Sequence, residues 1–422
     1  MTGSIPFDLL PETASIDAAG QLTVGGCNVL DLAAEFGTSL FVYDEEHLRN
    51  RCREAVGAFG DGVAFAGKAF LCKAMAKLAH EEGMHIDVAS GGELHVVLDA
   101  GVPADRIVLH GNNKSSGEIH AALDAGVSRI VVDSFDEIDR IEALEHPTTA
   151  KVLLRVTPGV KAETHDFIST GQDDSKFGFG VSSGQAGLAV ERAHSSDAME
   201  LIGIHNHIGS QVFRVESFAE ALSVVAEFSE PLGLSELSVG GGLGVAYVEG
   251  ESAPSISAWG AMIAEACDRL GVSAHVLAEP GRAIAAQAAL TLYTVGTIKT
   301  LPDIRTYVAV DGGFGDNPRP VLYGSDYTTF LPRDPAADRP QRVRVVGKHC
   351  ESGDILVRDA PVPADLSVGD VLATPVTGAY GQGMGSNYNK VLRPAVVFVR
   401  DGDARLVIRR ETLDDLLATD LG

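Results

Sequence analysis

Four groups in this chain could act together on one cofactor. They are Lys68, the glycine run Gly240-Gly241-Gly242, the carboxylate of Glu279 and the guanidinium of Arg282. A partly desolvated lysine can form a Schiff base with a carbonyl compound. Glycine N–H groups and an arginine bind phosphate, and a carboxylate accepts a proton from a protonated pyridine nitrogen. Together these groups predict a site for pyridoxal 5'-phosphate.

Each group also has an ordinary explanation. A lysine at the end of a strand is usually a solvated charge, a glycine run can be a plain tight turn, and Glu279 with Arg282 could be a surface ion pair. The cofactor interpretation depends on all four groups lying at one place, so the elements that carry them decide it.

All four groups follow short apolar runs of one repeated pattern. Eight times between about residue 63 and residue 282, such a run ends in polar or glycine residues and a helix-like segment follows. The run ends are Phe65-Ala66-Gly67-Lys68, Ile86-Asp87-Val88-Ala89-Ser90, Val108-Leu109-His110-Gly111-Asn112, Val131-Val132-Asp133-Ser134, Leu153-Leu154-Arg155-Val156, Ile204-His205-Asn206-His207, Leu237-Ser238-Val239-Gly240-Gly241-Gly242 and Val276-Leu277-Ala278-Glu279-Pro280-Gly281-Arg282. This alternation predicts an α/β fold, a (β/α)8 TIM-type barrel whose site lies at the C-terminal ends of its strands.

The pattern changes after Arg282. Strand-like runs without long helices follow at residues 290–295, 306–310, 342–346, 371–373 and 396–399, and proline and glycine separate them. They predict a C-terminal β-domain, a β-barrel or sandwich, that also uses the N-terminal segment. We expect an N-terminal segment at 1–45, the cofactor-binding barrel at 46–284, and at 285–422 a β-domain for substrate specificity and dimer contacts.

Composition excludes several classes of protein. The formal net charge of −25 argues against nucleic-acid binding, which needs a basic face. No apolar stretch reaches the roughly 20 residues that span a bilayer, and the N-terminus lacks the features of a signal peptide. The five cysteines are scattered, which favours reduced thiols and a cytoplasmic location.

A metal site is the rival interpretation of the strand ends. His205 and His207 are two residues apart on a strand, so both are expected on one face, and His110 and Asp133 could complete a zinc site of a barrel hydrolase. The glycine run and Glu279-Pro280-Gly281-Arg282 would have no role in such a hydrolase. We therefore expect no metal and interpret one imidazole as stacking on the pyridine ring.

Two groups in the β-domain could act on the substrate. Cys350 beside Glu351 could donate the proton that decarboxylation requires at the carbon losing carbon dioxide. Arg319 and Tyr323, four residues apart, could bind a carboxylate.

Six motifs carry a resemblance that extends from about residue 25 to residue 415. They are Thr164-His165-Asp166-Phe167-Ile168-Ser169-Thr170-Gly171, Ser175-Lys176-Phe177-Gly178-Phe179, His207-Ile208-Gly209-Ser210-Gln211, Glu279-Pro280-Gly281-Arg282, Cys350-Glu351-Ser352-Gly353-Asp354 and Ser386-Asn387-Tyr388-Asn389. With them the chain resembles the fold-type III pyridoxal-phosphate decarboxylases, and among these the diaminopimelate decarboxylases. It departs from the family in the glycine-rich stretch at 381–385 and in Phe65, where the family often has tyrosine.

The resemblance implies a role for each matching residue. Lys68 would bind the cofactor covalently, His207 would stack on its ring and Glu279 would pair with the pyridine nitrogen. The remaining cofactor contacts would come from Asp87, Ser210, Gly240, Gly241, Gly242, Gly281, Arg282 and Tyr380.

The resemblance also implies the substrate and the assembly. The small-molecule amino-acid substrate, meso-2,6-diaminopimelate, would contact Arg282, Arg319, Tyr323, Glu351 and Tyr380 and would be converted to L-lysine and carbon dioxide. Cys350 would be the proton donor and would reach the other subunit's site in a homodimer. Decarboxylases of ornithine, arginine or carboxynorspermidine are alternatives, but Arg319 disfavours a substrate whose distal end is only cationic. A silent binding protein on the same fold is the third alternative.

Overall fold

The chain forms two compact units. The computed structural model describes residues 7–159 and 174–422. The barrel unit consists of Arg51–Val245 and Ala253–Ala283, and the β unit consists of Met1–Asn50, Ala246–Ser252 and Ile284–Gly422. The segment Ala246–Ser252, which directly follows the glycine-rich stretch, therefore folds with the β unit.

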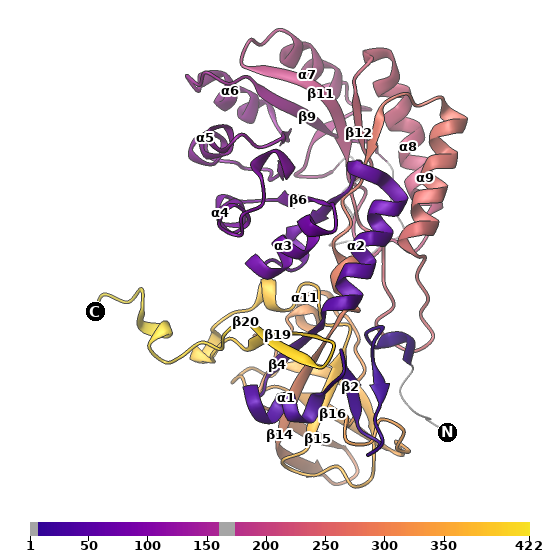
Figure 1. Cartoon of the computed structure of the whole chain (residues 1–422), viewed down its shortest axis with the longest axis vertical. Helices are drawn as coiled ribbons and strands as arrows, with labels where there is room; N and C mark the ends of the chain where they lie inside the picture. Colours follow the sequence, from indigo (N-terminus) through magenta and orange to yellow (C-terminus); the bar gives the residue numbers. More distant parts are fainter. Residues whose placement is uncertain (1–6, 160–173) are drawn as a thin grey trace. The chain divides into compact units, whose positions relative to one another are not determined.

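The barrel unit contains all eight predicted strands (Figure 1). They are β5 (Ala64–Ala66), β6 (His85–Val88), β7 (Ile107–Leu109), β8 (Arg129–Val132), β9 (Ala150–Thr157), β11 (Met199–Asn206), β12 (Glu236–Ser238) and β13 (His275–Leu277). Neighbouring strands pair in parallel from β5 through to β13, and β10 (Phe179–Gly180) pairs with β9 outside this path. The ring closes where the Ala64 N–H donates to the Ala278 carbonyl at 2.8 Å and the Ala278 N–H to the Gly62 carbonyl at 2.9 Å. The predicted barrel is confirmed.

Helices precede, connect and follow the strands of the barrel. They are α2 (Glu45–Phe59), α3 (Lys73–Glu81), α4 (Gly91–Asp99), α5 (Ser116–Ala125), α6 (Phe135–Ala143), α7 (Gln185–His194), α8 (Glu216–Ser229), α9 (Ile256–Leu270) and the short α10 (Arg282–Ala285), with 3-10 turns at Gly60–Gly62, Gly67–Ala69, Ala104–Arg106 and Glu230–Leu232. Ser90 and Ser134, two of the polar residues at the predicted strand ends, cap α4 and α6 by accepting backbone N–H groups. Their role is thus to begin helices, because a serine hydroxyl satisfies a first-turn N–H group.

The barrel interior has an apolar layer below its polar end. Val108, Val131, Leu153 and Leu277 form this buried cluster, with Ile202 packed against it. Side chains along each strand point alternately into and out of the barrel, and the inward-pointing side chains of a TIM-type barrel stack in layers that fill its core. The layer is packed with side chains and supports the polar groups at the C-terminal strand ends.

The β unit is a mixed, mostly antiparallel sheet (Figure 1). Its strands are β4 (Leu40–Asp44), β14 (Ala289–Leu301), β15 (Arg305–Val310), β16 (Gln341–Val346), β17 (Ile355–Val362), β18 (Val371–Pro375), β19 (Ala395–Arg400) and β20 (Asp403–Ile408). The strand order is β17-β16-β15-β14-β4-β19-β20, and β18 also pairs with β14. The predicted use of the N-terminal segment is confirmed, because β4 pairs with both β14 and β19.

A small three-stranded sheet covers part of the β unit's core. It consists of β1 (Ser15–Ile16), β2 (Leu22–Val24) and β3 (Cys27–Asn28), and α1 (Val29–Phe36) follows it. Leu22, Val24 and Leu32 pack in one buried cluster with Val42 of β4 and Leu292 of β14. The unit also contains α11 (Arg319–Tyr323) and 3-10 turns at Phe7–Leu9, Gln382–Met384, Tyr388–Lys390 and Asp415–Leu417. Within the described part of the chain, no helix has the length and apolar character needed to cross a membrane.

A buried lysine joins two strand ends of the barrel to α6. Lys114 is 2% exposed, and its Nζ donates to the carbonyl oxygens of Gly111 and Val131 at 2.6 Å each. It also forms an ion pair with Glu137 Oε1 at 2.6 Å. Each partner neutralises the other, so removal of one leaves an uncompensated buried charge.

We predict that Lys114→Ala lowers the free energy of unfolding by about 3–5 kcal/mol, since Glu137 would remain buried without its cation. Urea unfolding followed by circular dichroism measures this difference. Lys77→Ala is the matched control, because Lys77 is 67% exposed and lies 4.0 Å from Glu81. Its effect should stay below about 0.5 kcal/mol, and equal losses in the two variants would contradict the prediction.

Candidate active site

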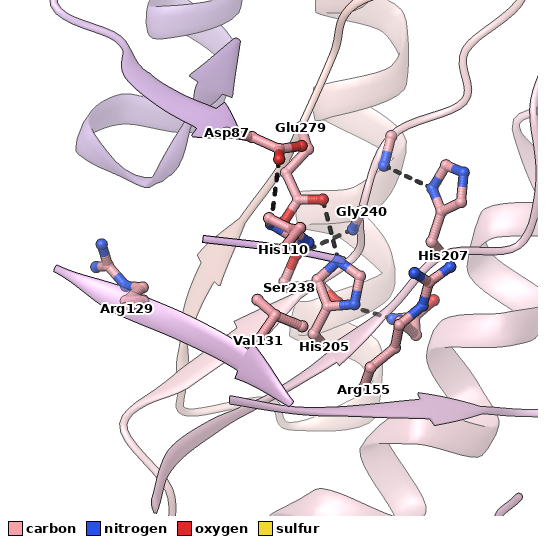
Figure 2. A network of polar contacts seen from close by, with 12 residues as sticks. Asp87, His110, Arg129, Val131, Arg155, His205, His207, Ser238, Gly240 and Glu279 are labelled. Carbon is pink, nitrogen blue, oxygen red and sulfur yellow. Dashed lines mark hydrogen bonds and ion pairs between the residues drawn. The ribbon is translucent and has the colours of Figure 1, made fainter. Parts of the chain in front are cut away.

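Polar side chains from five strands meet at the C-terminal end of the barrel unit (Figure 2). They are Asp87 on β6, His110 after β7, Arg155 on β9, His205 on β11 and Glu279 after β13, and all except the half-buried Glu279 are buried. Strand register explains the convergence, because His205 lies opposite Arg155 on one side and Ser238 on the other. The predicted meeting of strand-end residues is thus present in the barrel unit.

Glu279 is held by two hydrogen-bond donors. His205 Nε2 lies 3.0 Å from Oε2, and the Ser238 hydroxyl donates to Oε1 at 3.0 Å. His110 Nε2 is 3.5 Å from Oε1. Burial alone would raise the pKa of Glu279, but His205 and His110 outweigh it and hold this pKa well below its usual range. The carboxylate is therefore ionised.

Asp87 behaves in the opposite way. Burial and, after it, the charge of Glu279 raise the pKa of Asp87 well above its usual range. Its Oδ1 lies 3.6 Å from His110 Nε2, and burial lowers the pKa of His110 well below its usual range. Near neutral pH this part of the cluster therefore holds an ionised Glu279 beside a neutral His110, and Asp87 gives up its proton less readily than Glu279 does.

His207 has different neighbours from His205. Its Nδ1 accepts the N–H of Gly241 at 3.2 Å (Figure 2). Burial, then the charges of Lys68 and Arg155, lower the pKa of His207 well below its usual range. The imidazole is neutral, and its Nδ1 is already in use as an acceptor. It can offer a flat uncharged face to an aromatic ring.

The candidate metal ligands do not assemble as the sequence suggested. In the described ranges, one group of side chains could hold an ion, and it consists of His110, His205 and Glu279 with ligand atoms within 4.8 Å of one another. His207 and Asp133 are not in this group. Asp133 instead accepts the N–H of Gly178 at 2.8 Å.

Lys68 lies in the 3-10 turn Gly67–Ala69 that follows β5. Its side chain is exposed and forms no hydrogen bond or ion pair with residues that the structure describes. Its charge nevertheless lowers the pKa of His207 and opposes the rise in that of Asp87. The amine is thus near the buried cluster and available for reaction.

The glycine run has a structural reason as well as a chemical one. A Cβ on Gly241 would collide with the carbonyl oxygen of Glu279, and one on Gly242 with that of Gly209. The Gly240 N–H donates to Ser238 Oγ at 3.1 Å, and the Gly241 N–H donates to His207. Among the described residues the Gly242 N–H has no acceptor, so backbone donation to an anion depends on Gly242.

Arg282 and Ser210 form the second part of the predicted phosphate site. The Arg282 Nη2 donates to Ser210 Oγ at 2.7 Å, and Arg282 is 7% exposed. Gly281 packs against β5, because a Cβ there would lie 2.9 Å from the Ala66 Cβ. A guanidinium beside a hydroxyl is a suitable anion-binding pair.

Arg319 in the β unit is surrounded by tyrosines. Its Nη1 donates to the Tyr327 hydroxyl at 2.6 Å, and its guanidinium carbon lies 4.0 Å above the centre of the Tyr247 ring. Tyr323 ends the same short helix and is half-buried. Sequence reasoning missed Tyr247 and Tyr327, which are separated from Arg319 in the chain and follow no recognisable motif.

The other predicted residues of the β unit are accessible. Cys350 and Glu351 are exposed, and the Cys350 N–H donates to Asn389 Oδ1 at 2.7 Å. Tyr380 is half-buried and has a positive φ of 59°, unusual for a residue with a side chain. The motif at 164–171 lies outside the described residues.

Arg155 was also missed as a member of the barrel cluster. Its guanidinium carbon lies 4.2 Å from the centre of the Phe177 ring, and Nη1 lies 3.9 Å from Asp133 Oδ2. An arginine inside an otherwise apolar strand was the available signal, since buried charges need partners.

Comparisons with known proteins identify the family of this chain. The family model described as pyridoxal-dependent decarboxylase, pyridoxal binding domain, matches residues 45–286. Diaminopimelate decarboxylase of Mycobacterium tuberculosis is 46% identical, with 97% of each chain covered. The Bacillus subtilis enzyme of that name is 43% identical, with 98% of each chain covered. The crystal structure of diaminopimelate decarboxylase from M. jannaschii with L-lysine has a TM-score of 0.90 at 32% identity and covers 97% of this chain and 98% of its own. The chain therefore belongs to the diaminopimelate decarboxylases, within the pyridoxal-dependent decarboxylase family.

Proposed function

We propose that this protein decarboxylates meso-2,6-diaminopimelate to L-lysine and carbon dioxide with pyridoxal 5'-phosphate as cofactor, the last step of lysine biosynthesis. The observation that carries this function is the ionised Glu279, held by His205 and Ser238 near the available amine of Lys68. The relatives named above carry the same activity in their names, and the M. jannaschii structure contains L-lysine.

The residues present fit the cofactor. Lys68 offers an amine for its aldehyde, and Glu279 offers an ionised oxygen to the ring N–H. Arg282, Ser210 and the Gly242 N–H are suited to its phosphate. When bound, the cofactor takes up the electrons of the breaking carbon–carboxylate bond.

Glu279 stabilises positive charge on the ring nitrogen. Its negative charge favours a proton on that nitrogen, and its two hydrogen bonds from His205 and Ser238 restrict its rotation. Asp87 gives up its proton less readily than Glu279 does, so the negative charge of the cluster is concentrated on Glu279. His207 would supply a neutral surface for the ring, and Gly240, Gly241 and Gly281 allow the backbone at these strand ends to pack closely against neighbouring segments of the barrel unit.

The distal end of the substrate is assigned to the β unit. Arg319 with Tyr323 would bind the distal carboxylate, Glu351 the distal amino group, and Arg282 and Tyr380 would contact both cofactor and substrate. A guanidinium recognises a carboxylate in two-point geometry. Ornithine and arginine have no distal carboxylate, which disfavours them as substrates.

Cys350 is proposed as the proton donor in a homodimer, with its thiol serving the partner subunit's site. Its exposure and that of Glu351 support this assignment. The β unit would then provide both specificity and dimer contacts. The predicted cytoplasmic location is retained as a proposal, and all five cysteines are free thiols. A metal hydrolase is not favoured, because the hydrogen bonds of His205 and Ser238 give Glu279 a role without an ion.

Lys68→Ala should abolish visible cofactor absorbance and lower the rate of carbon dioxide release by at least about 10³-fold, as removal of a covalent catalyst does. Absorbance spectra and product analysis for lysine measure both effects. Lys73→Ala is the control, since Lys73 is 67% exposed and pairs with Asp99 at 3.0 Å. An active, cofactor-free Lys68 variant would refute the proposal.

Arg319→Lys should raise KM for diaminopimelate by about 10–100-fold and change kcat less, because lysine cannot bind a carboxylate at two points. Steady-state kinetics separate the two constants. Arg358→Lys is the control, on β17, with a side chain that is 47% exposed. An unchanged KM in the Arg319 variant would remove Arg319 from substrate binding.

The shared site predicts complementation between two inactive variants. Mixed Lys68→Ala and Cys350→Ala subunits should recover up to about one quarter of wild-type activity, because half of randomly formed dimers are mixed and each has one complete site. Activity after subunit exchange and sedimentation analysis test this. A monomer in sedimentation, or no recovery after proven exchange, would count against the dimer.

A further inference from the structure

A buried hydrogen-bonded pair of side chains closes the loop that carries Cys350 and Glu351. This loop joins β16 to β17, and His349 Nδ1 lies 2.8 Å from Asp354 Oδ2. The two side chains are 0% and 2% exposed. The pair lies directly before and after the exposed part of the loop, so it fixes both of its ends.

The Asp354 carboxylate has hydrogen-bond partners on both of its oxygens. Oδ1 accepts the Phe314 N–H at 2.7 Å, and Oδ2 accepts the His349 N–H at 2.9 Å in addition to the imidazole. Phe314 belongs to the segment that follows β15, so the carboxylate joins two separate segments. Removal of its charge would weaken all of these hydrogen bonds together.

Glycines make room for the pair. A Cβ on Gly347 would collide with Asp354 Oδ2, and one on Gly313 would lie 2.5 Å from His349 Nδ1. A Cβ on Gly315 would lie 2.8 Å from His349 Nε2. The surrounding backbone is therefore packed directly against the two side chains.

A third segment holds the Cys350 backbone itself. Asn389 Oδ1 accepts the Cys350 N–H at 2.7 Å, and the Ser386 N–H donates to the Gly315 carbonyl at 3.0 Å. The Phe314 ring stacks on the His349 ring with 4.5 Å between the ring centres, and the centre of the Tyr388 ring lies 5.4 Å from that of Phe314. The stretch Ser386-Asn387-Tyr388-Asn389 thus packs onto the loop of Cys350.

We propose that the His349–Asp354 pair and Asn389 are positioning residues that fix the Cys350 backbone and so set the direction from which its thiol delivers a proton. This inference rests on the proton-donor role proposed above. One torsion moves the sulfur once the backbone is fixed, which leaves three staggered positions.

The proton transfer that depends on this placement moves one proton from the Cys350 thiol to a carbon atom of the substrate. The S–H bond of Cys350 breaks, and the proton forms a C–H bond with the electron pair left on the carbon that lost carbon dioxide. The thiolate then takes a proton from water. A displacement of about 1 Å can lower such a rate by about 10²-fold.

The test uses the holoenzyme with Asp354→Asn and Asn389→Gly. Glycine accepts the positive φ of 53° at position 389 and lacks only the acceptor, and Asn389 is exposed, so this variant keeps the fold. Asp359→Asn is the matched control, because Asp359 on β17 is 73% exposed. His349→Asn retains a donor near the place of Nδ1, whereas His349→Leu has none.

Two readouts are measured. Amide hydrogen exchange in residues 347–354 should become at least about tenfold faster in Asp354→Asn and Asn389→Gly, because local opening becomes easier. Turnover in D2O by the wild type should place deuterium in one configuration at the carbon that lost carbon dioxide. Both variants and His349→Leu should give mixed configurations, with kcat lowered about 10–100-fold and KM nearly unchanged. His349→Asn should restore a single configuration.

Retention of a single configuration in both Asp354→Asn and Asn389→Gly overturns the proposal, whatever their exchange rates. Cys350→Ala separates this failure from that of the proposed function. If Cys350→Ala keeps the wild-type rate and configuration, the proton-donor role itself is wrong. If Cys350→Ala loses them while the loop variants keep them, only the positioning role is wrong.

Discussion

The charge on Glu279, whose side chain is 11% exposed, is the constraint on which the barrel unit's chemistry depends. An ionised carboxylate loses several kcal/mol of hydration when it is buried, and hydrogen bonds must replace that hydration. Here His205 and Ser238 each donate to one oxygen. They come from neighbouring strands in which they lie directly opposite each other. A slip of one residue in that register would turn one of these side chains to the other face of the sheet. The ionised state of Glu279 therefore depends on the correct pairing of the two strands.

The second carboxylate shows why the charge lies on Glu279. Asp87 and Glu279 interact in a space where burial penalises two anions, and only Glu279 has hydrogen bonds to ring and hydroxyl donors within the described cluster. Asp87 therefore holds its proton more strongly than Glu279 does. A protonated ring nitrogen bound in this cluster, as proposed, would therefore meet the negative charge of Glu279. This division of roles between two similar side chains follows from their surroundings alone.

The barrel fold and the region of its site could be predicted from the sequence, because parallel strands bring their C-terminal ends together whatever lies between them. Lys68 and Glu279 were predicted in this way, and Asp87 was added by the resemblance to the family. Other features needed three-dimensional contacts. Ser134, one of the polar residues at the predicted strand ends, caps a helix, and the Gly241 N–H, expected to bind phosphate, donates to His207. Tyr247 reaches Arg319 because the segment after the glycines folds with the β unit, and no local pattern predicts such a change of unit.

The chain uses buried carboxylates in two chemically different ways. Glu137 pairs with the ammonium of Lys114, which neutralises its charge and makes the pair a fixed structural joint. Glu279 receives hydrogen bonds from an imidazole and a hydroxyl, and it remains available to a cationic ring. Asp354 resembles Glu137, since every donor around it comes from the segments that it joins. The partners of a carboxylate thus indicate whether it holds the fold together or binds a ligand. By this criterion Asp354 has a structural role, which is to hold the loop of Cys350 in place.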